Sequence, residues 1–303
     1  GAFGSASRSV VPMTVARGQG IRNITRPSSA EGKITAPSVA RRPRGRRNQP
    51  AWNSSTTRPR CHGRIPSTVN EIHPTAIIGP DVELGRDNVI GPFAVLTGPV
   101  GLGDSNWLGA GVVIGAPPEV RSFDHRTEAV GHEPAGVHIG SGNRIREYAQ
   151  IHQGWKQTTR IGDDTFIMNQ SYVAHDGVLG DGVTLASSCL LAGHVPVGDV
   201  ADLGLGVAVH QFTSIGAGAM IGIGAVVTRD IPAFAMAYGN PARVRGANRV
   251  GLRRLGVAEE PIAQIHSAYE NGDLALDLAA AELPQTVRER LISLTLQPGR
   301  DDG

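Results

Sequence analysis

Several features are scarce in this chain, and each scarcity narrows what the protein can be. Its 303 residues include only two cysteines, Cys61 and Cys189, so we expect no disulfide framework and a reducing, cytoplasmic location. Neither cysteine has another at metal-ligand spacing, and we expect Cys189 to be a small buried apolar side chain. No apolar run approaches the roughly 20 residues that span a bilayer, which predicts no integral membrane segment.

Aromatic residues are also few, at 4% of the chain, whereas glycine is abundant, at 40 residues. Glycine therefore has about twice its usual share. This composition predicts many tight turns around a core of small aliphatic side chains.

Acidic residues are almost missing from the start of the chain. Residues 1–64 hold thirteen Lys and Arg against one acid, Glu31, while the remainder holds sixteen bases and twenty-six acids. The nearly neutral total therefore says little about partners. With no apolar period, residues 1–68 are expected to be a disordered basic leader. We favour an extension without function. An artificial extension, a transit peptide and a nucleic-acid tail at residues 40–47 stay open.

An aliphatic residue returns at every sixth position along most of the remaining sequence. The series covers three stretches, residues 72–114, 139–151 and 161–227. A period of six fits neither a helix nor a single strand, and a register held this long indicates an internal repeat. It is typical of a parallel β-helix, in which each hexapeptide gives one short strand and one turn. Gly, Asn or Asp beside the aliphatic residue permits the corner, and three hexapeptides complete a triangular coil of about 18 residues.

The register breaks twice, and each break predicts a loop outside the prism. The first, residues 115–138, is called the long excursion here. The second is the "QGWKQTT" segment, residues 153–159, called the short excursion, where ten residues separate Ile151 from Ile161 instead of six. Long loops in repeat arrays are often functional, and we interpret the long excursion in that way.

Helical spacing replaces the repeat near the end of the chain. It covers Leu252–Asn271 and Leu274–Leu296, with Pro261 and Pro284 placed to start helices. We therefore expect a β-helix domain over residues 69–240 and an α-helical domain over residues 241–303 that caps it.

Four histidines fall near one corner of the predicted prism. Once the short excursion is removed, His152, His175, His194 and His210 lie 19, 19 and 16 residues apart, which stacks them on successive coils. A single histidine is commonly a packing residue, but a column of four favours a site. A metal centre is the weaker interpretation because no cysteine or further carboxylate joins them. General-base catalysis is the stronger one, because Asp176 beside His175 can fix the imidazole tautomer and stabilise the imidazolium.

Several motifs occur here in a specific order: "GSGNRIREYAQIHQG", "VAHDGVLGD", "LAGHVPVGD", "AVHQFTSIGAGAMIG" and "GLRRLG". Over about residues 70–270 the sequence resembles the UDP-N-acetylglucosamine O-acyltransferase family of lipid A biosynthesis. The resemblance implies a left-handed parallel β-helix, assembled as a homotrimer with active sites between neighbouring prisms. It also implies transfer of a 3-hydroxyacyl group from acyl carrier protein to the sugar 3-hydroxyl, without a cofactor.

The same resemblance assigns roles to individual residues. His175 matches the general base, Asp176 the residue that orients it, and Gly193 the oxyanion donor. Further matching positions contact substrate or hold the nucleotide end, and these are His152, His194, His210, Gln211, Asn248 and Arg254. A basic face for the acidic carrier protein is expected at Arg249, Arg253 and Arg254.

Some positions depart from the family pattern. Tyr172 stands where a histidine is usual, Val250 replaces an acid, and Leu255 replaces the second arginine of a pair. In the long excursion, Glu119 and Arg121 substitute for the acidic and basic residues of a sugar-binding loop. These changes leave the acceptor open.

Ile223 stands where a glycine in the family admits a long acyl chain. A branched side chain there predicts a preference for shorter acyl chains, about ten carbons or fewer. Two alternatives to the family activity stay open. One is a related acyltransferase for a different nucleotide sugar or an amine, and the other is a catalytically silent repeat scaffold. We expect no metal and no nucleic-acid partner.

Overall fold

The computed structural model describes residues 69–123, 135–274 and 285. The predicted leader, the middle of the long excursion and nearly all of the predicted helix Leu274–Leu296 lie outside the described residues. Within the described part, no helix is long and apolar enough to cross a bilayer.

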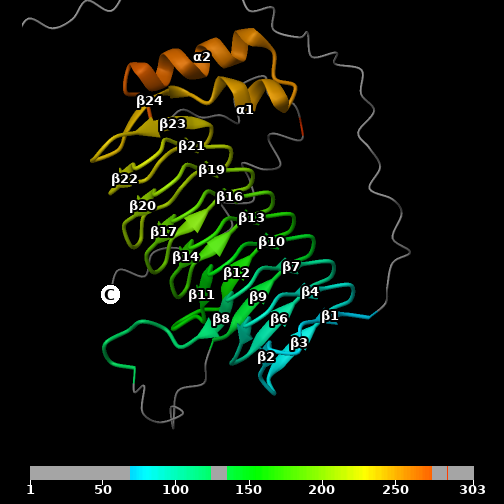
Figure 1. Cartoon of the computed structure of the whole chain (residues 1–303). Coiled ribbons are helices and arrows are strands. Elements are labelled where there is room, and N and C mark those ends of the chain that lie inside the picture. Colours follow the sequence, from blue (N-terminus) through cyan, green and yellow to red (C-terminus); the bar gives the residue numbers. More distant parts are fainter. Residues whose placement is uncertain (1–68, 124–134, 275–284, 286–303) are drawn as a thin grey trace, which may run out of the picture. The chain divides into compact units, whose positions relative to one another are not determined.

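Short strands, all parallel except β24, form three sheets, which are the faces of a β-solenoid (Figure 1). The first sheet contains, in spatial order, β1 (Glu71–Ile72), β4 (Val89–Ile90), β7 (Trp107–Leu108), β10 (Arg144–Ile145), β13 (Phe166–Ile167), β16 (Thr184–Leu185), β19 (Asp202–Leu203), β21 (Met220–Ile221), β23 (Ala235–Tyr238) and β24 (Arg243–Ala247). The second contains β2 (Ile77–Ile78), β5 (Val95–Leu96), β8 (Val113–Ala116), β11 (Gln150–His152), β14 (Tyr172–Val173), β17 (Leu190–Leu191), β20 (Ala208–Val209) and β22 (Val226–Val227). The third contains β3 (Val82–Leu84), β6 (Val100–Leu102), β9 (Val137–Ile139), β12 (Thr159–Ile161), β15 (Val178–Leu179) and β18 (Pro196–Val197).

The pairing register confirms the predicted parallel β-helix. Ile72 pairs with Ile90 and Ile161 with Leu179, which is one coil of 18 residues in each case. The aliphatic residue of nearly every hexapeptide is buried in the prism, and most of these side chains have 0–3% of their surface exposed. Cys189 is among the fully buried residues, as expected, and burial raises the pKa of its thiol to about 11.

The two breaks of the repeat are loops between paired strands, and the pairing of β11 with β8 shifts by one residue between Ile151 and His152. Across the long excursion, Leu108 pairs with Ile145, 37 residues on. Across the short excursion, Ile151 pairs with Val173, 22 residues on. The coil pairing therefore continues past both loops, and the short excursion adds the predicted four residues.

A ladder of asparagines runs along the first coils, and its members are buried except for the partly exposed Asn70. The side-chain oxygens of Asn70, Asn88 and Asn106 accept the backbone N–H of the asparagine one coil higher, each at 2.9 Å. The last acceptor, Asn143, binds Thr165 instead. These asparagines lie at a corner, between the third and first sheets, as the sequence predicts. Their side chains also satisfy buried backbone groups.

The C-terminal part contains a strand and two helices. β24 pairs antiparallel with β23 and extends the first sheet beyond residue 240. The predicted helix Leu252–Asn271 is two helices, α1 (Arg249–Arg254) and α2 (Glu259–Glu270). Gly256, at φ +80°, lies between them, in a left-handed conformation that glycine adopts without steric cost. The ring of His266 in α2 accepts the Ala247 N–H of β24 at 3.0 Å.

Candidate active site

All four predicted histidines lie at the corner that follows the second sheet. Register places His152, Ala174, Ala192 and His210 at the same position on successive coils. One residue further stand Gln153, His175, Gly193 and Gln211, followed by Gly154, Asp176, His194 and Phe212. The predicted column is confirmed. The four histidines lie on successive coils, one on each, and are spread over three adjacent positions of the corner.

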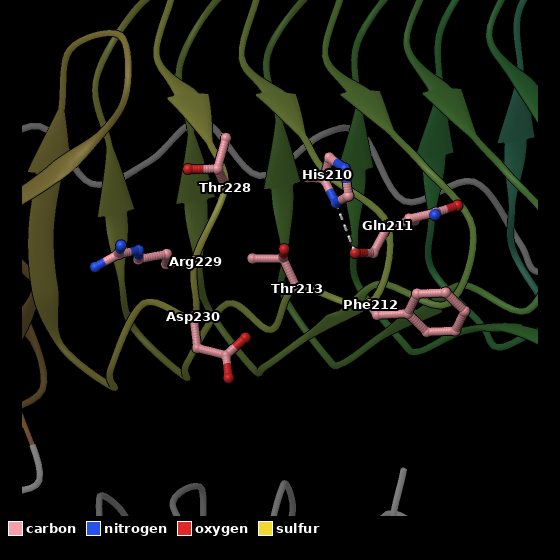
Figure 2. Close-up of a pocket in the computed structure, with 7 residues that line it drawn as sticks. All are labelled: His210, Gln211, Phe212, Thr213, Thr228, Arg229 and Asp230. Carbon is pink, nitrogen blue, oxygen red and sulfur yellow. Dashed lines mark hydrogen bonds between the residues drawn. The ribbon is translucent and has the colours of Figure 1, made fainter. Parts of the chain in front are cut away.

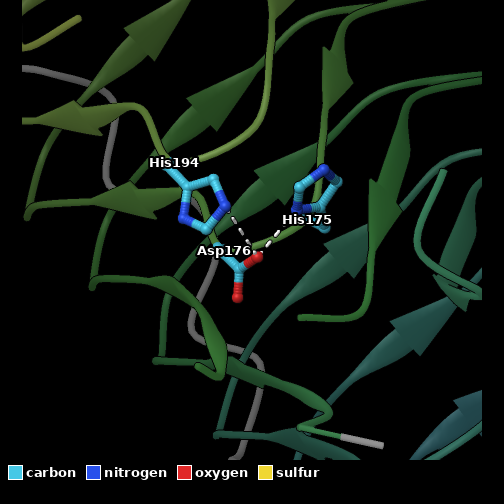
Figure 3. Close-up of side chains that lie close together, drawn as sticks. All are labelled: His175, Asp176 and His194. Carbon is cyan, nitrogen blue, oxygen red and sulfur yellow. Dashed lines mark hydrogen bonds and ion pairs between the residues drawn. The ribbon is translucent and has the colours of Figure 1, made fainter. Parts of the chain in front are cut away.

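His175 and Asp176 form a hydrogen-bonded pair (Figure 3). The distance from His175 Nδ1 to Asp176 Oδ2 is 2.7 Å, and His194 Nε2 lies 3.4 Å from the same oxygen. The Asp176 side chain is fully buried, while that of His175 is 16% exposed. The bond to Asp176 holds Nδ1 of His175, so Nε2 is the ring nitrogen left to act on a substrate.

The short excursion supplies the other partners of Asp176. The backbone N–H groups of Trp155, Lys156 and Gln157 donate to Asp176 Oδ1 at 3.1, 2.8 and 2.7 Å. Such a concave group of N–H donors is a nest for an anion. The break in the repeat predicted this loop but not its role. The four extra residues near Asp176 were the available signal.

These contacts shift the pKa values of Asp176 and His194. Burial alone would raise the pKa of Asp176, but hydrogen bonds from His175 and the N–H groups of Gln157 and Lys156 outweigh it and hold the pKa below its usual range. Burial lowers the pKa of His194 despite the nearby Asp176 charge. The site therefore holds a carboxylate beside a neutral His194.

Gly193 passes directly over the His175 ring. A Cβ atom at this position would lie 2.6 Å from His175 Cε1 and 2.7 Å from Nε2, so only glycine leaves Nε2 open. Its carbonyl accepts the Phe212 N–H at 3.2 Å. Within the described part of the chain, the Gly193 N–H has no hydrogen-bond partner.

A pocket of about 340 Å³ continues from the histidine column toward the C-terminal coils (Figure 2). It is lined by His210, Gln211, Phe212, Thr213, Thr228, Arg229 and Asp230. Phe212 joins the pocket to the column, because its ring stacks on His194 at 4.6 Å. The sequence motifs predicted the first two of these residues and not the others, although Thr228, Arg229 and Asp230 occupy the same corner one coil further on.

The base of the long excursion contacts the column on its other side. His152 Nδ1 lies 2.8 Å from the Pro117 carbonyl oxygen, and its ring lies 5.2 Å from that of Tyr172. The Tyr172 hydroxyl donates to Glu119, and burial followed by this carboxylate raises the tyrosine pKa. Glu119 is thus brought to the site with its carboxylate already bound, while Arg121 is exposed beside it.

The remaining predicted residues lie away from this corner. The Asn248 side chain caps α1, accepting the Gly251 N–H and donating to the Gly218 carbonyl, both at 2.9 Å. Arg254 lies near Asp202 of the first sheet, whose pKa burial raises against the charge of Arg254. Ile223 is 75% exposed at the corner between the first and second sheets. One chain therefore does not gather all predicted site residues.

Three side chains of the site could also hold a metal ion. Ligand atoms of His175, Asp176 and His194 lie within 4.8 Å of one another. Both carboxylate oxygens already accept hydrogen bonds, and a cation ligated by His175 Nδ1 would displace the His175–Asp176 bond. The donor set fits a general-base pair more directly than a metal centre.

The hexapeptide solenoid and its histidine–aspartate pair define the class as a hexapeptide-repeat transferase. Residues 230–292 match the family described as UDP-N-acetylglucosamine O-acyltransferase, domain 2. A relative from Thiobacillus denitrificans, named acyl-[acyl-carrier-protein]–UDP-N-acetylglucosamine O-acyltransferase, is 40% identical over 220 residues, or 66% of this chain and 83% of the relative. The equally named protein of Stutzerimonas stutzeri is 38% identical and covers 71% and 88%.

Solved structures agree with these relatives. The UDP-N-acetylglucosamine acyltransferase of Campylobacter jejuni aligns with a TM-score of 0.61 and 30% identity, over 75% of this chain and 97% of that one. The Arabidopsis enzyme aligns with a TM-score of 0.55 and 29% identity, over 74% and 87%. The chain belongs to the UDP-N-acetylglucosamine O-acyltransferase family.

Proposed function

We propose that this enzyme transfers a 3-hydroxyacyl group from acyl carrier protein to the 3-hydroxyl of UDP-N-acetylglucosamine. The main support is the geometry of the His175–Asp176 pair. His175 Nδ1 lies 2.7 Å from Asp176 Oδ2, and His175 Nε2 faces Gly193. This geometry suits a base that activates an alcohol directly.

The reaction needs no covalent enzyme intermediate. His175 Nε2 takes the proton of the sugar hydroxyl as its oxygen attacks the thioester carbonyl and forms the new C–O bond. The negative oxygen that develops is stabilised by the Gly193 N–H. Asp176 stabilises the His175 imidazolium. When the C–S bond breaks, the imidazolium returns its proton to the departing thiolate of the carrier.

The division of the predicted residues between two corners supports a homotrimer. The histidine column occupies one corner, whereas Asn248 binds the Gly218 carbonyl and Arg254 lies near Asp202 on the first sheet. We propose that Asn248 and Arg254 of a neighbouring copy hold the nucleotide end. In the cleft between two neighbouring copies, the exposed Ile223 would contact the acyl chain and favour shorter chains.

A transfer assay tests the function. Purified protein is mixed with UDP-N-acetylglucosamine and 3-hydroxyacyl carrier proteins of graded length, and the product is identified by mass spectrometry. We expect an ester product whose formation requires His175, with the highest rate at about ten carbons or fewer. No product at any length, with product from another nucleotide sugar or an amine, would favour the alternative acceptor.

A further inference from the structure

The two excursions of the solenoid meet each other beside the active site. The ring of Phe123 in the long excursion packs edge-on against the ring of Trp155 in the short excursion, with centroids 6.0 Å apart and planes at 75°. Aromatic pairs prefer this T-shaped arrangement. It joins residues 32 positions apart that share no strand pairing.

Residues 117–123 are anchored to the solenoid at their start. His152 contacts the Pro117 carbonyl oxygen, and the Tyr172 hydroxyl binds Glu119. Two short internal bonds follow, from Val120 N–H to the Pro118 carbonyl and from Phe123 N–H to the Val120 carbonyl. The described part of the long excursion thus reaches Trp155 as a folded turn.

The backbone of Trp155 contacts Asp176 of the catalytic pair. Its N–H is the first of the three donors to Asp176 Oδ1. Thr159 adds a second link, because its hydroxyl accepts the Asp176 N–H at 3.0 Å. Any displacement of the Trp155 backbone therefore moves a donor that holds the carboxylate, and the carboxylate holds His175.

We propose that Trp155 is a positioning residue through which the long excursion controls the orientation of His175. Its ring is held by Phe123, and its N–H holds Asp176. Because Glu119 and Arg121 belong to the same turn as Phe123, an acceptor sugar that contacts this turn is coupled to the alignment of the base. The coupling rests on the proposed function, since it concerns the acceptor side of that reaction.

The test removes one ring of the contact and leaves the site residues intact. Phe123→Ala is compared with Phe123→Tyr, which keeps the ring, and with Phe93→Ala. Phe93 is an exposed phenylalanine at a corner of an early coil. Its replacement therefore removes the same ring at a position away from the two excursions. Each variant is also made in an Asp176→Asn background, and thermal unfolding and oligomeric state verify that every variant folds.

We expect Phe123→Ala to lower kcat about tenfold, since small misplacements of a catalytic group are costly, with acceptor KM changed less than threefold. Phe123→Tyr restores the rate, and Phe93→Ala does not alter it. In the Asp176→Asn background the Phe123→Ala effect falls below twofold, because residues that act as a unit are not additive. A full effect in that background, or a change in KM alone, would overturn the proposal.

A measurement without turnover separates this proposal from the proposed function. The proton on His175 Nδ1 is followed by NMR in ¹⁵N-histidine-labelled protein and assigned by its loss in His175→Ala. We expect its resonance to shift or broaden in Phe123→Ala and to stay unchanged in Phe93→Ala. If wild-type protein transfers no acyl group yet the resonance responds, only the proposed function fails. An unchanged resonance in Phe123→Ala overturns the positioning role whatever the activity.

Discussion

At the scale of single residues, the buried carboxylate of Asp176 organises the site. A buried charge is tolerated only with enough hydrogen bonds, and Asp176 has three backbone donors besides His175. Its full burial keeps water from competing for His175. The same contacts make the site sensitive to acid.

The lowered pKa of Asp176 predicts acid-dependent stability. The folded state binds this proton more weakly than the unfolded state does. The stabilisation is therefore complete above the ordinary aspartate pKa of about 3.9 and is lost as the pH falls through the lower folded value. The lowered pKa of His194 acts in the same direction, beginning near pH 6.5. Asp176→Asn should flatten the acid side of a plot of unfolding midpoint against pH. An unchanged slope would contradict this account.

Gly193 offers a sharper test at the same scale. Its φ lies outside the left-handed region, so Gly193→Ala is limited by the His175 ring and not by the backbone. We expect the methyl group to displace Nε2 and to lower kcat about a hundredfold, with a small change in unfolding temperature. Gly79→Ala, where the nearest atom would lie at 3.3 Å, is the matched control. Equal activity of the two variants would show that the approach of Gly193 to His175 is unimportant.

At the scale of elements, the coils carry stability and the excursions carry the site. The asparagine ladder shows how the coils satisfy buried polar groups, since Asn106 accepts the Asn143 N–H and donates to the Gly140 carbonyl. The ladder ends where Thr165 takes the next position, and there the Asn143 side-chain nitrogen has no partner among the described residues.

Removal of one asparagine from the ladder should lower the free energy of unfolding more than the small size of its side chain suggests. Asn106→Ala leaves the Asn143 N–H and the Gly140 carbonyl unpaired, and we expect a loss of about 2 kcal/mol in the free energy of unfolding. Asn169→Ala is the control, because Asn169 is exposed and, among the residues the structure describes, its side chain binds the Ser187 hydroxyl alone. Urea unfolding measures both. Similar losses would mean that the ladder does not stabilise the coils.

The sequence predicted the coils better than it predicted the site. A six-residue period reports which side chains point inward, so strands, coil length and the histidine column followed from counting. The adjacent His175 and Asp176 also suggested their pairing. The nest at Trp155, the stacking of Phe212 on His194 and the contact between the two excursions depend on loop conformation. No periodicity encodes that conformation, and the break between α1 and α2 was missed because Leu252 to Asn271 keeps helical spacing throughout.

At the scale of the whole molecule, one chain presents two incomplete halves of the proposed site. The histidine column lies at one corner, and Arg254 lies near Asp202 on the first sheet. A cyclic trimer has heterologous interfaces, so it would bring unlike corners of neighbouring copies together. Light scattering is expected to give three chains per particle.

Mixed particles test whether the halves combine. His175→Ala and Arg254→Ala chains, each impaired alone, are coexpressed and purified together. In a trimer with shared sites, an Arg254→Ala chain still supplies His175, and its His175→Ala neighbour still supplies Arg254. About a quarter of the sites in an equal mixture should then be intact. Activity no greater than that of the separate variants would place each complete site within one chain.

The most direct measurement is kcat/KM for acyl transfer to UDP-N-acetylglucosamine by wild-type protein and by His175→Ala under identical conditions. If His175 is the general base, we expect His175→Ala to lower kcat/KM about 10²–10⁴-fold, the usual contribution of such a base. Its oligomeric state and unfolding temperature should stay unchanged. A folded His175→Ala variant that kept its rate within threefold of wild type would contradict the assignment of His175 as the general base.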